Sequence, residues 1–213
     1  GGVLKLAANS DDGQWSVETV DGDGDVGRHA TLVLKAQGDP QIAYSDAGQG
    51  DLHPAAWTGS AWLVQTVDSA GNVGSYLSQA ADAQGASRIA YYDAGQGDLK
   101  YAAWTGSGWH IQTVDATGNI GVHASLALDE LGRPRIAYTN AGSDELRYAW
   151  WTAVGWEIQV VRSGKNTAAS SSLALDENGR ARISFYDPAW RHLRLASIEP
   201  FGVYLPFLTG DPN

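Results

Sequence analysis

Short stretches in which hydrophobic and polar residues alternate run along the whole chain, separated by Gly, Asp, Asn and Pro. Alternation with a period of two, bounded by such turn-forming residues, is typical of β-strands. The 3.6-residue period of an amphipathic helix is missing. The pattern therefore predicts an all-β protein.

The alternating stretches are copies of one repeat, because several series of equivalent residues return in register every 47 positions. These series are Ile42, Ile89, Ile136 and Ile183; Trp15, Trp62, Trp109 and Trp156; and Leu52, Leu99, Leu146 and Leu193. Each copy holds four short strands, and four strands in roughly 40 to 50 residues, repeated, form one blade of a β-propeller. A β-solenoid usually has a shorter coil. The sequence therefore favours a β-propeller of four-stranded antiparallel blades.

Residue types indicate where each strand lies within its blade. The first strand of a repeat alternates small residues with leucine, as in Ser172 to Leu175, and small side chains fit the crowded strand beside the propeller axis. The fourth strand begins with tryptophan and carries β-branched residues, which suits the outer edge. We expect the tyrosine of each second strand and the tryptophan of each fourth strand to pack between neighbouring blades. Those tyrosines are Tyr44, Tyr91 and Tyr138.

The repeat divides residues 1–213, taken as one propeller domain, into blade positions. A half blade over 3–20 comes first, and four full blades follow over 31–67, 78–114, 125–161 and 172–208. Two lone strands are marginal in water, so a neighbour must complete or bury the half blade. We favour five blade positions with the first incomplete. A four-bladed ring closed by the N-terminal strand is the alternative.

The C-terminal segment 199–213 offers a third arrangement, in which one subunit completes a blade of another. The expected last strand holds six residues, Val203, Tyr204, Leu205, Pro206, Phe207 and Leu208. Pro206 lacks the N–H that a central strand needs, so this strand lies at an edge or is partly detached. Strand exchange through it would give oligomers or filaments.

Composition and charge narrow the partners. The chain has a net charge of -10, a pI of about 4.7 and only four lysines, which argues against nucleic acid or an anionic membrane surface as a partner. It has no apolar run of about 18 residues, so no membrane span is expected. Cysteine is absent, which excludes a disulfide framework and thiolate metal sites. Methionine is absent even at position 1, so we expect that a leader or upstream segment precedes Gly1.

Four motifs of the repeat resemble those of secreted bacterial and archaeal propeller proteins. They read G-x-H/Y-x-S-L-A-L-D, R-I-A-Y-Y-D, L-K-Y-A-x-W and W-x-I-Q-T-V-D, and the likeness covers about residues 3 to 198. Proteins with such repeats accompany surface, adhesion and lectin-like architectures. The final V-Y-L-P segment also looks like short tails of some secreted bacterial proteins. The resemblance implies a propeller fold and an extracellular or cell-surface location.

Three aromatic residues are the first candidates for a ligand-binding site. His29, Tyr76 and His123 occupy equivalent positions at the entrance of the innermost strand, and Ser170 holds that place in the last blade. Loops joining the fourth strand to the next blade and the second strand to the third share this face. We therefore expect the three side chains to ring the mouth of the axial funnel, where propellers usually bind ligands. Anchoring the strand by hydrogen bonds is the structural alternative.

A second candidate lies on the opposite face, in hairpins that each carry two tryptophans. The first tryptophans of the hairpins are Trp57, Trp104 and Trp151. Exposed indoles can stack on sugar rings, so a carbohydrate site between blades is one interpretation. The other is that the indoles cover the hairpin end and fill the interblade core.

A weak calcium signal comes from Asp21, Asp23 and Asp25, because alternating carboxylates present oxygen atoms to a hard cation. The equivalent loops keep only the first acid and a Gly-Asn turn, so a repeated turn explains the segment as well. No other cofactor is expected.

No unrepeated set of catalytic residues stands out. Hydrolytic propellers use paired carboxylates near the axis, whereas Asp82, Asp129 and Asp176 look like turn residues at the far ends of the axial strands. We therefore expect a non-enzymatic, extracellular structural or adhesive module that assembles with itself or with another surface protein. A lectin-like, carbohydrate-binding propeller is the alternative, and a glycan hydrolase comes third.

Overall fold

The computed structural model describes residues 1–164, 169–199 and 202–204, and all its regular elements are β-strands. The chain opens with a two-stranded antiparallel sheet made of β1 (Leu4–Asn9) and β2 (Trp15–Asp21). The next sheet has four strands, β3 (Val26–Leu34), β4 (Pro40–Asp46), β5 (Asp51–Trp57) and β6 (Trp62–Val64). No helix of the described residues is long and apolar enough to cross a membrane.

Three more four-stranded sheets follow in chain order. The second full blade comprises β7 (Val73–Ala81), β8 (Ser87–Asp93), β9 (Asp98–Trp104) and β10 (Trp109–Asp115). The third comprises β11 (Ile120–Leu128), β12 (Pro134–Asn140), β13 (Glu145–Thr152) and β14 (Gly155–Ser163). The fourth comprises β15 (Ala169–Leu175), β16 (Ala181–Asp187), β17 (His192–Glu199) and β18 (Gly202–Tyr204). Antiparallel four-stranded blades confirm the predicted β-propeller.

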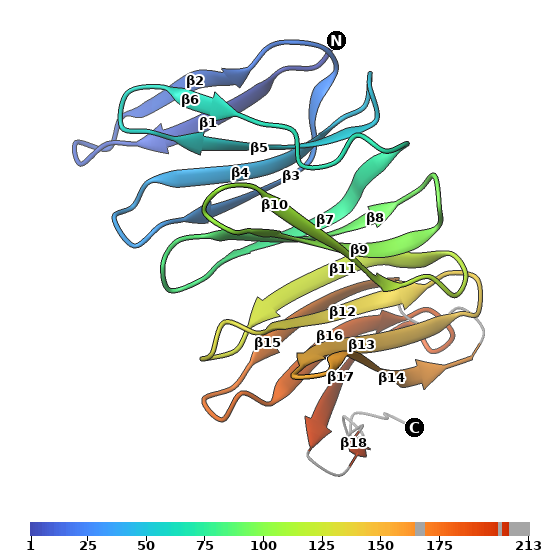
Figure 1. Cartoon of the computed structure of the whole chain (residues 1–213). Coiled ribbons are helices and arrows are strands. Elements are labelled where there is room, and N and C mark those ends of the chain that lie inside the picture. The colour runs from blue at the N-terminus through green and yellow to red at the C-terminus, as the bar shows by residue number, and fades with distance from the viewer. Residues whose placement is uncertain (165–168, 200–201, 205–213) are drawn as a thin grey trace.

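The blades form an open row, which Figure 1 shows from the blue N-terminal pair to the orange-red last sheet. The half blade and the last blade lie at opposite ends of this row in both views. β1 and β2 pair with each other and pack on the first full blade through Leu4 and Val20. The N-terminal strands therefore occupy a first, incomplete blade position and do not close a four-bladed ring.

The first strand of each blade lies against its counterpart in the next blade, as the small residues predict. Ser78 Oγ accepts a hydrogen bond from the backbone N–H of Leu126 at 3.0 Å. One blade further on, Ser125 Oγ accepts from the N–H of Leu173 at 2.9 Å. A short hydroxyl side chain is needed at this point, because a longer one would hold the two backbones apart.

Hydrophobic clusters fill each junction between blades. The second strand contributes a fully buried aromatic ring every time, from Tyr44, Tyr91, Tyr138 and Phe185. Trp62, Trp109 and Trp156 of the fourth strands pack against the same clusters. Both sets of rings lie between blades as predicted. The fold is held mainly by these nearest-neighbour junctions, as in other repeat proteins.

The C-terminal strand completes its own blade as far as it is described. β18 pairs with β17 in antiparallel register, with Ser197 opposite Tyr204 and Glu199 opposite Gly202. Leu205, Pro206, Phe207 and Leu208 of the proposed assembly strand lie outside the described residues.

Candidate functional site

Four residues at the entrances of the inner strands share a backbone conformation that side chains rarely adopt. His29, Tyr76, His123 and Ser170 have φ angles of 53°, 48°, 56° and 59°. The pairing register of each inner strand shifts beside them, so they sit on β-bulges. Left-handed backbone at residues other than glycine costs free energy and concentrates at functional sites. The repeat therefore keeps a strained residue at this position in every full blade.

The strained positions bring three rings into contact across two blade junctions. The ring of Tyr76 lies 5.4 Å from that of His29 and 4.9 Å from that of His123, measured between centroids. Tyr76 keeps 37% of its surface exposed, His29 is exposed and His123 is half-buried. The three residues proposed from sequence are thus neighbours, and they form an open aromatic surface that we call the mouth cluster.

The mouth cluster has a fourth member that the sequence did not single out. Tyr92 of β8 lies with its ring centroid 6.2 Å from that of Tyr76, and its hydroxyl donates a hydrogen bond to the side chain of Asn119. Partial burial, followed by the charge of Asp93, raises the pKa of the Tyr92 hydroxyl. Its repeat equivalents are Ser45, Thr139 and Tyr186, and the change of residue type between neighbouring blades was the available signal.

Side-chain bonds within a blade and between neighbouring blades fix the backbone beneath the cluster. Ser171 Oγ donates to the carbonyl oxygen of His123 at 3.0 Å, and Ser45 Oγ donates to that of Arg28 at 3.1 Å. Gly121, two residues before His123, lies so close to β9 that an added Cβ would stand 3.0 Å from Cα of Leu99. This close approach, together with a φ of 104°, requires glycine there.

Burial lowers the pKa of the His123 imidazole below its usual value of about 6.5. His123 is therefore neutral at pH 7 and can accept a hydrogen bond or a proton through one ring nitrogen. An unfolded chain binds this proton at higher pH than the folded chain does. The stability that neutral His123 contributes is thus present above about pH 6.5 and is lost as the pH falls through the lower, folded value.

We expect NMR titration to give an apparent pKa below 6.5 for His123. Replacement by glutamine, which cannot titrate, should reduce the loss of stability between about pH 7 and pH 5. Urea unfolding of both proteins at the two pH values measures this difference. An unchanged pH dependence in His123→Gln, or a pKa at or above 6.5, would contradict the assignment.

Buried ion pairs lie at two blade junctions, one between the first and second full blades and the other between the second and third. Lys100 Nζ lies 2.7 Å from Asp93 Oδ2 and 3.3 Å from Asp68 Oδ2, and Tyr91 donates its hydroxyl to Asp68 at 2.7 Å. One blade later, Arg147 and Tyr138 approach Asp115 in the same way, each at 2.8 Å. The recurrence in successive blades marks a structural network.

Burial by itself would raise the pKa of Asp68, but bonds from the Ala70 N–H and the Tyr91 hydroxyl, together with the charge of Lys100, outweigh it and lower that pKa. Asp68 therefore stays ionised, and this charge needs Lys100 beside it.

The acidic residues predicted to be turn residues have that role. Asp82, Asp129 and Asp176 accept backbone hydrogen bonds in their turns, and each also pairs with an arginine six residues later, at 2.7, 2.9 and 3.0 Å. These carboxylates lie at the end of the strands away from the mouth cluster.

The three acids of the calcium hypothesis bind different partners. Asp21 accepts bonds from the backbone N–H of Asp23 and from the Tyr44 hydroxyl, while Asp25 binds the N–H of Gly2 and pairs with Arg28 at 2.8 Å. Within residues 1–164, 169–199 and 202–204, no group of three or more His, Cys, Asp or Glu side chains could hold a metal ion. The alternating acids are therefore not gathered into a cation site.

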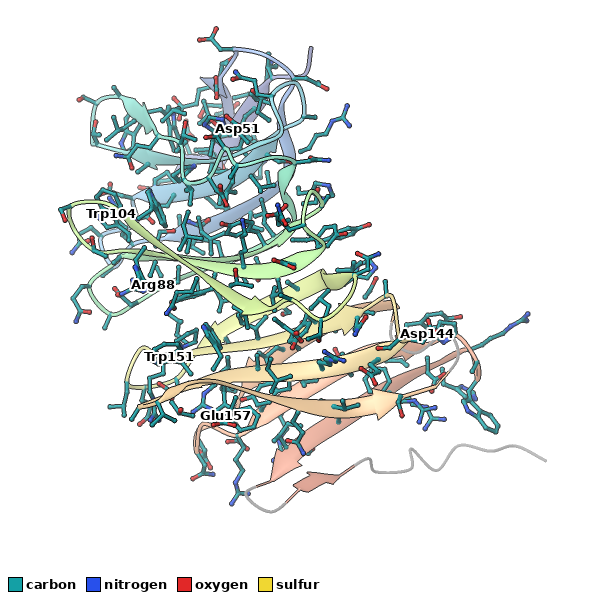
Figure 2. The ribbon with its side chains drawn as sticks, turned by 45° about the vertical axis from the view of Figure 1, so that its right-hand side comes forward. Asp51, Arg88, Trp104, Asp144, Trp151 and Glu157 are labelled. Carbon is teal, nitrogen blue, oxygen red and sulfur yellow. The ribbon has the colours of Figure 1, made fainter. Side chains whose placement is uncertain are left out.

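The double-tryptophan hairpins do not all line the same surface. The paired rings of each hairpin lie about 5.5 Å apart, and Trp57 and Trp104 face a common groove between the first two full blades. Trp151 lines no part of that groove. Figure 2 shows Trp104, Arg88 and Trp151 at one end of the strands and Asp144 at the other.

Comparison with known proteins finds solved structures of similar fold. No protein-family model and no curated sequence matches the chain. A Hadza microbial sialidase superposes with a TM-score of 0.62 at 13% identity over 84% of this chain and 46% of its own. A polysaccharide lyase, PL25 ulvan lyase bound to -[GlcA(1-4)Rha3S]-, gives 0.62 at 14% identity over 92% and 58%. A xylan β-1,4-xylosidase from Bacillus halodurans gives 0.53 at 12% identity over 98% and 56%.

At such identities the likeness establishes the propeller fold, and the chain spans about half the length of these three proteins. The expectation that the chain is not an enzyme is contradicted, because most of the similar structures are glycoside hydrolases, sialidases and lyases. That expectation rested on the sequence, which shows no pair of carboxylates that stands apart from the repeated positions. Repeat positions occupied by different side chains in successive blades can also supply catalytic groups.

Proposed function

We propose that this chain is a carbohydrate-active β-propeller module that binds a glycan at the mouth cluster. The observation that carries the proposal is the contact of Tyr76 with His29 and His123 on strained backbone. A strained, partly exposed aromatic surface offers apolar faces for sugar rings together with polar ring atoms for their hydroxyl groups. The many glycan-active proteins among the similar structures support this class of ligand.

The mouth cluster also offers groups that can move a proton. Neutral His123 can accept a proton. The hydroxyl groups of Tyr76 and Tyr92 can each donate a proton to a base. Turnover at this site would therefore use imidazole and phenol groups, in contrast to the paired carboxylates of most glycoside hydrolases. A screen of polysaccharides should measure new reducing ends, which hydrolysis releases, and ultraviolet absorbance, which unsaturated sugar ends formed by a lyase produce.

A glycan array, followed by calorimetry with the best ligand, tests the proposal. We expect Tyr76→Ala and His123→Ala each to weaken binding by at least about tenfold, which corresponds to about 1.4 kcal/mol. Tyr186→Ala is the matched control, because Tyr186 is exposed to a similar extent, 41%, but lies on the last blade. Binding as tight as that of the wild type in all three variants, or no glycan binding by the wild type, would refute the proposed function.

Assembly with another protein is a second candidate role, favoured by the outer face of the last blade. Leu193 is 67% exposed there, whereas its equivalents Leu52, Leu99 and Leu146 are completely buried between blades. Tyr186 and Leu195 add to this apolar face. Such a surface suits a further blade-like layer, from a second copy or from a surface protein outside the cell. The solution mass of the chain with and without residues 199–213, and of Leu193→Arg, tests this role.

A further inference from the structure

A groove of about 790 Å³ lies between the first and second full blades, at the opposite end of the strands from the mouth cluster. Three tryptophans form part of its wall: Trp57 at the end of β5, Trp104 at the end of β9 and Trp109 at the start of β10. Gln41, Gln65 and Gln84 supply amide groups, and Lys35 supplies positive charge. The groove therefore combines flat apolar faces with polar donors.

Pro54 explains why the groove opens at this junction. In the next two blades the same repeat position holds Tyr101 and Tyr148, which are buried in the junctions that follow. Tyr101 lies edge-on to Trp156 of the following blade, with ring centroids 5.4 Å apart. Pro54 faces the corresponding Trp109 with a much smaller side chain, so the space that the phenol ring fills elsewhere is left open.

The backbone beside Pro54 has adapted to the missing N–H. The carbonyl of Gln65 stands opposite this residue and contacts Nδ1 of His53 at 3.0 Å. The fourth strand of this blade, β6, has only three residues, whereas β10 has seven. Both adaptations belong to the first full blade, so the departure from the repeat is built into its fold.

Charge also departs from the repeat at this groove. Position 35 is lysine, whereas the equivalents Asp82, Asp129 and Asp176 each pair with an arginine. The place of that arginine is taken by Gln41, whose side chain donates to the carbonyl of Gly85 at 2.9 Å. Lys35 forms no ion pair with the described residues, and none of the residues lining the groove is acidic, although the Arg88 guanidinium is paired with Asp82 at 2.7 Å just outside it. In a chain with a net charge of -10, the groove thus holds one lysine without an ion-pair partner among the described residues.

We propose that the groove binds an acidic sugar, a ring carrying a carboxylate or a sulfate group. The anionic group meets Lys35, and charge-assisted hydrogen bonds make this the specific contact. The sugar ring lies against the indoles, and its hydroxyl groups reach the glutamine amides. Trp109 Nε1 is buried without a hydrogen-bond partner in the described structure and can donate to the ligand. Nε1 of Trp156 is also unpartnered, but Tyr101 covers its ring and no groove opens there.

This site goes beyond the proposed function, because it uses other residues at the other end of the blades. Titration of the whole chain with three tetrasaccharides tests it: an oligoglucuronate, a sulfated neutral oligosaccharide and an uncharged cello-oligosaccharide. Calorimetry gives the affinity, and the shifts of tryptophan Nε1–H signals in NMR spectra give the location. We expect one or both acidic probes to bind at least about tenfold more tightly than the uncharged one and to shift the Trp109 signal. The two acidic arms distinguish carboxylate from sulfate.

Two variants restore the residue types that the repeat uses in other blades. Pro54→Tyr refills the groove and should abolish binding while leaving the melting temperature equal or higher. Lys35→Asp reverses the anchoring charge and should weaken acidic probes by at least about tenfold. Lys5→Asp makes the same charge change on an exposed position of β1 and should leave binding unchanged.

Binding that survives Pro54→Tyr, equal affinity for acidic and uncharged probes, or no binding of any probe would overturn the proposal. His123→Ala removes a mouth residue and should not affect this groove. Loss of acidic-sugar binding in His123→Ala but not in Lys35→Asp would place the acidic sugar at the mouth cluster. The experiments can therefore reject the groove and the mouth cluster independently of each other.

Discussion

Replacement of Lys100 by methionine should destabilise the chain by about 3–5 kcal/mol, because it leaves buried carboxylates without their cation. Asp93 is fully buried and Asp68 nearly so, and the Lys100 side chain, itself only 14% exposed, is paired with both. Methionine retains much of the length and apolar packing of the lysine stem. The loss therefore comes from charge and not from volume. Urea unfolding followed by tryptophan fluorescence measures it.

The pH dependence of this loss provides an internal check. The pKa of Asp68 is lowered in the folded chain, so its contribution is present above about pH 4 and disappears as the pH falls through the folded value. The difference between wild type and Lys100→Met should accordingly be largest near neutral pH and shrink in acid. Lys5→Met, on an exposed position, should change stability by less than about 0.5 kcal/mol. A loss in Lys100→Met no larger than that of this control would contradict the buried network.

Truncation of Leu99 to alanine should cost about 2–5 kcal/mol, because it leaves a cavity at the junction of the second and third blades. Leu99 is fully buried in a cluster with Ile120, Ile136 and Tyr138. The close approach of Gly121 to its backbone holds the two blades together at this point and limits their collapse into the cavity. The free energy of unfolding in urea gives the magnitude.

The repeat supplies the matched control for this truncation. Leu193 has the same place in the last blade but is 67% exposed. Leu193→Ala should therefore change stability by less than about 0.5 kcal/mol. Equal losses at the two positions would show that the outer face of the last blade is covered in solution, which would support assembly through that face.

The fold was largely predictable from the sequence because period and residue type agree at each repeat position. The tryptophans and the second-strand tyrosines occur at fixed spacing, so the number and order of strands in each blade followed from the pattern. The inner strands of the first three full blades begin five residues earlier than expected, as at Val26 where 31 was predicted. The alternation is broken there by the bulges that carry His29 and its equivalents.

The candidate sites were less predictable, because they arise where the repeat is broken or strained. Sequence position placed His29, Tyr76 and His123 at one end of the blades, but the left-handed backbone that brings their rings together has no signature in side-chain alternation. Pro54 and Lys35 were visible as departures from the repeat. Their joint effect depends on packing across a blade junction, which the order of residues in one blade does not show. A carbohydrate site at each of Trp57, Trp104 and Trp151 remains a prediction, and the first two tryptophans line one groove.

The crystal structure of the chain with the tightest-binding oligosaccharide from the array tests the central proposal most directly. The account predicts a sugar ring at the mouth cluster, in van der Waals contact with Tyr76 and within hydrogen-bonding distance of a ring nitrogen of His123. A second sugar in the groove beside Pro54 is compatible with this result. An oligosaccharide bound elsewhere, with the mouth cluster in contact with solvent alone, would contradict the proposed function.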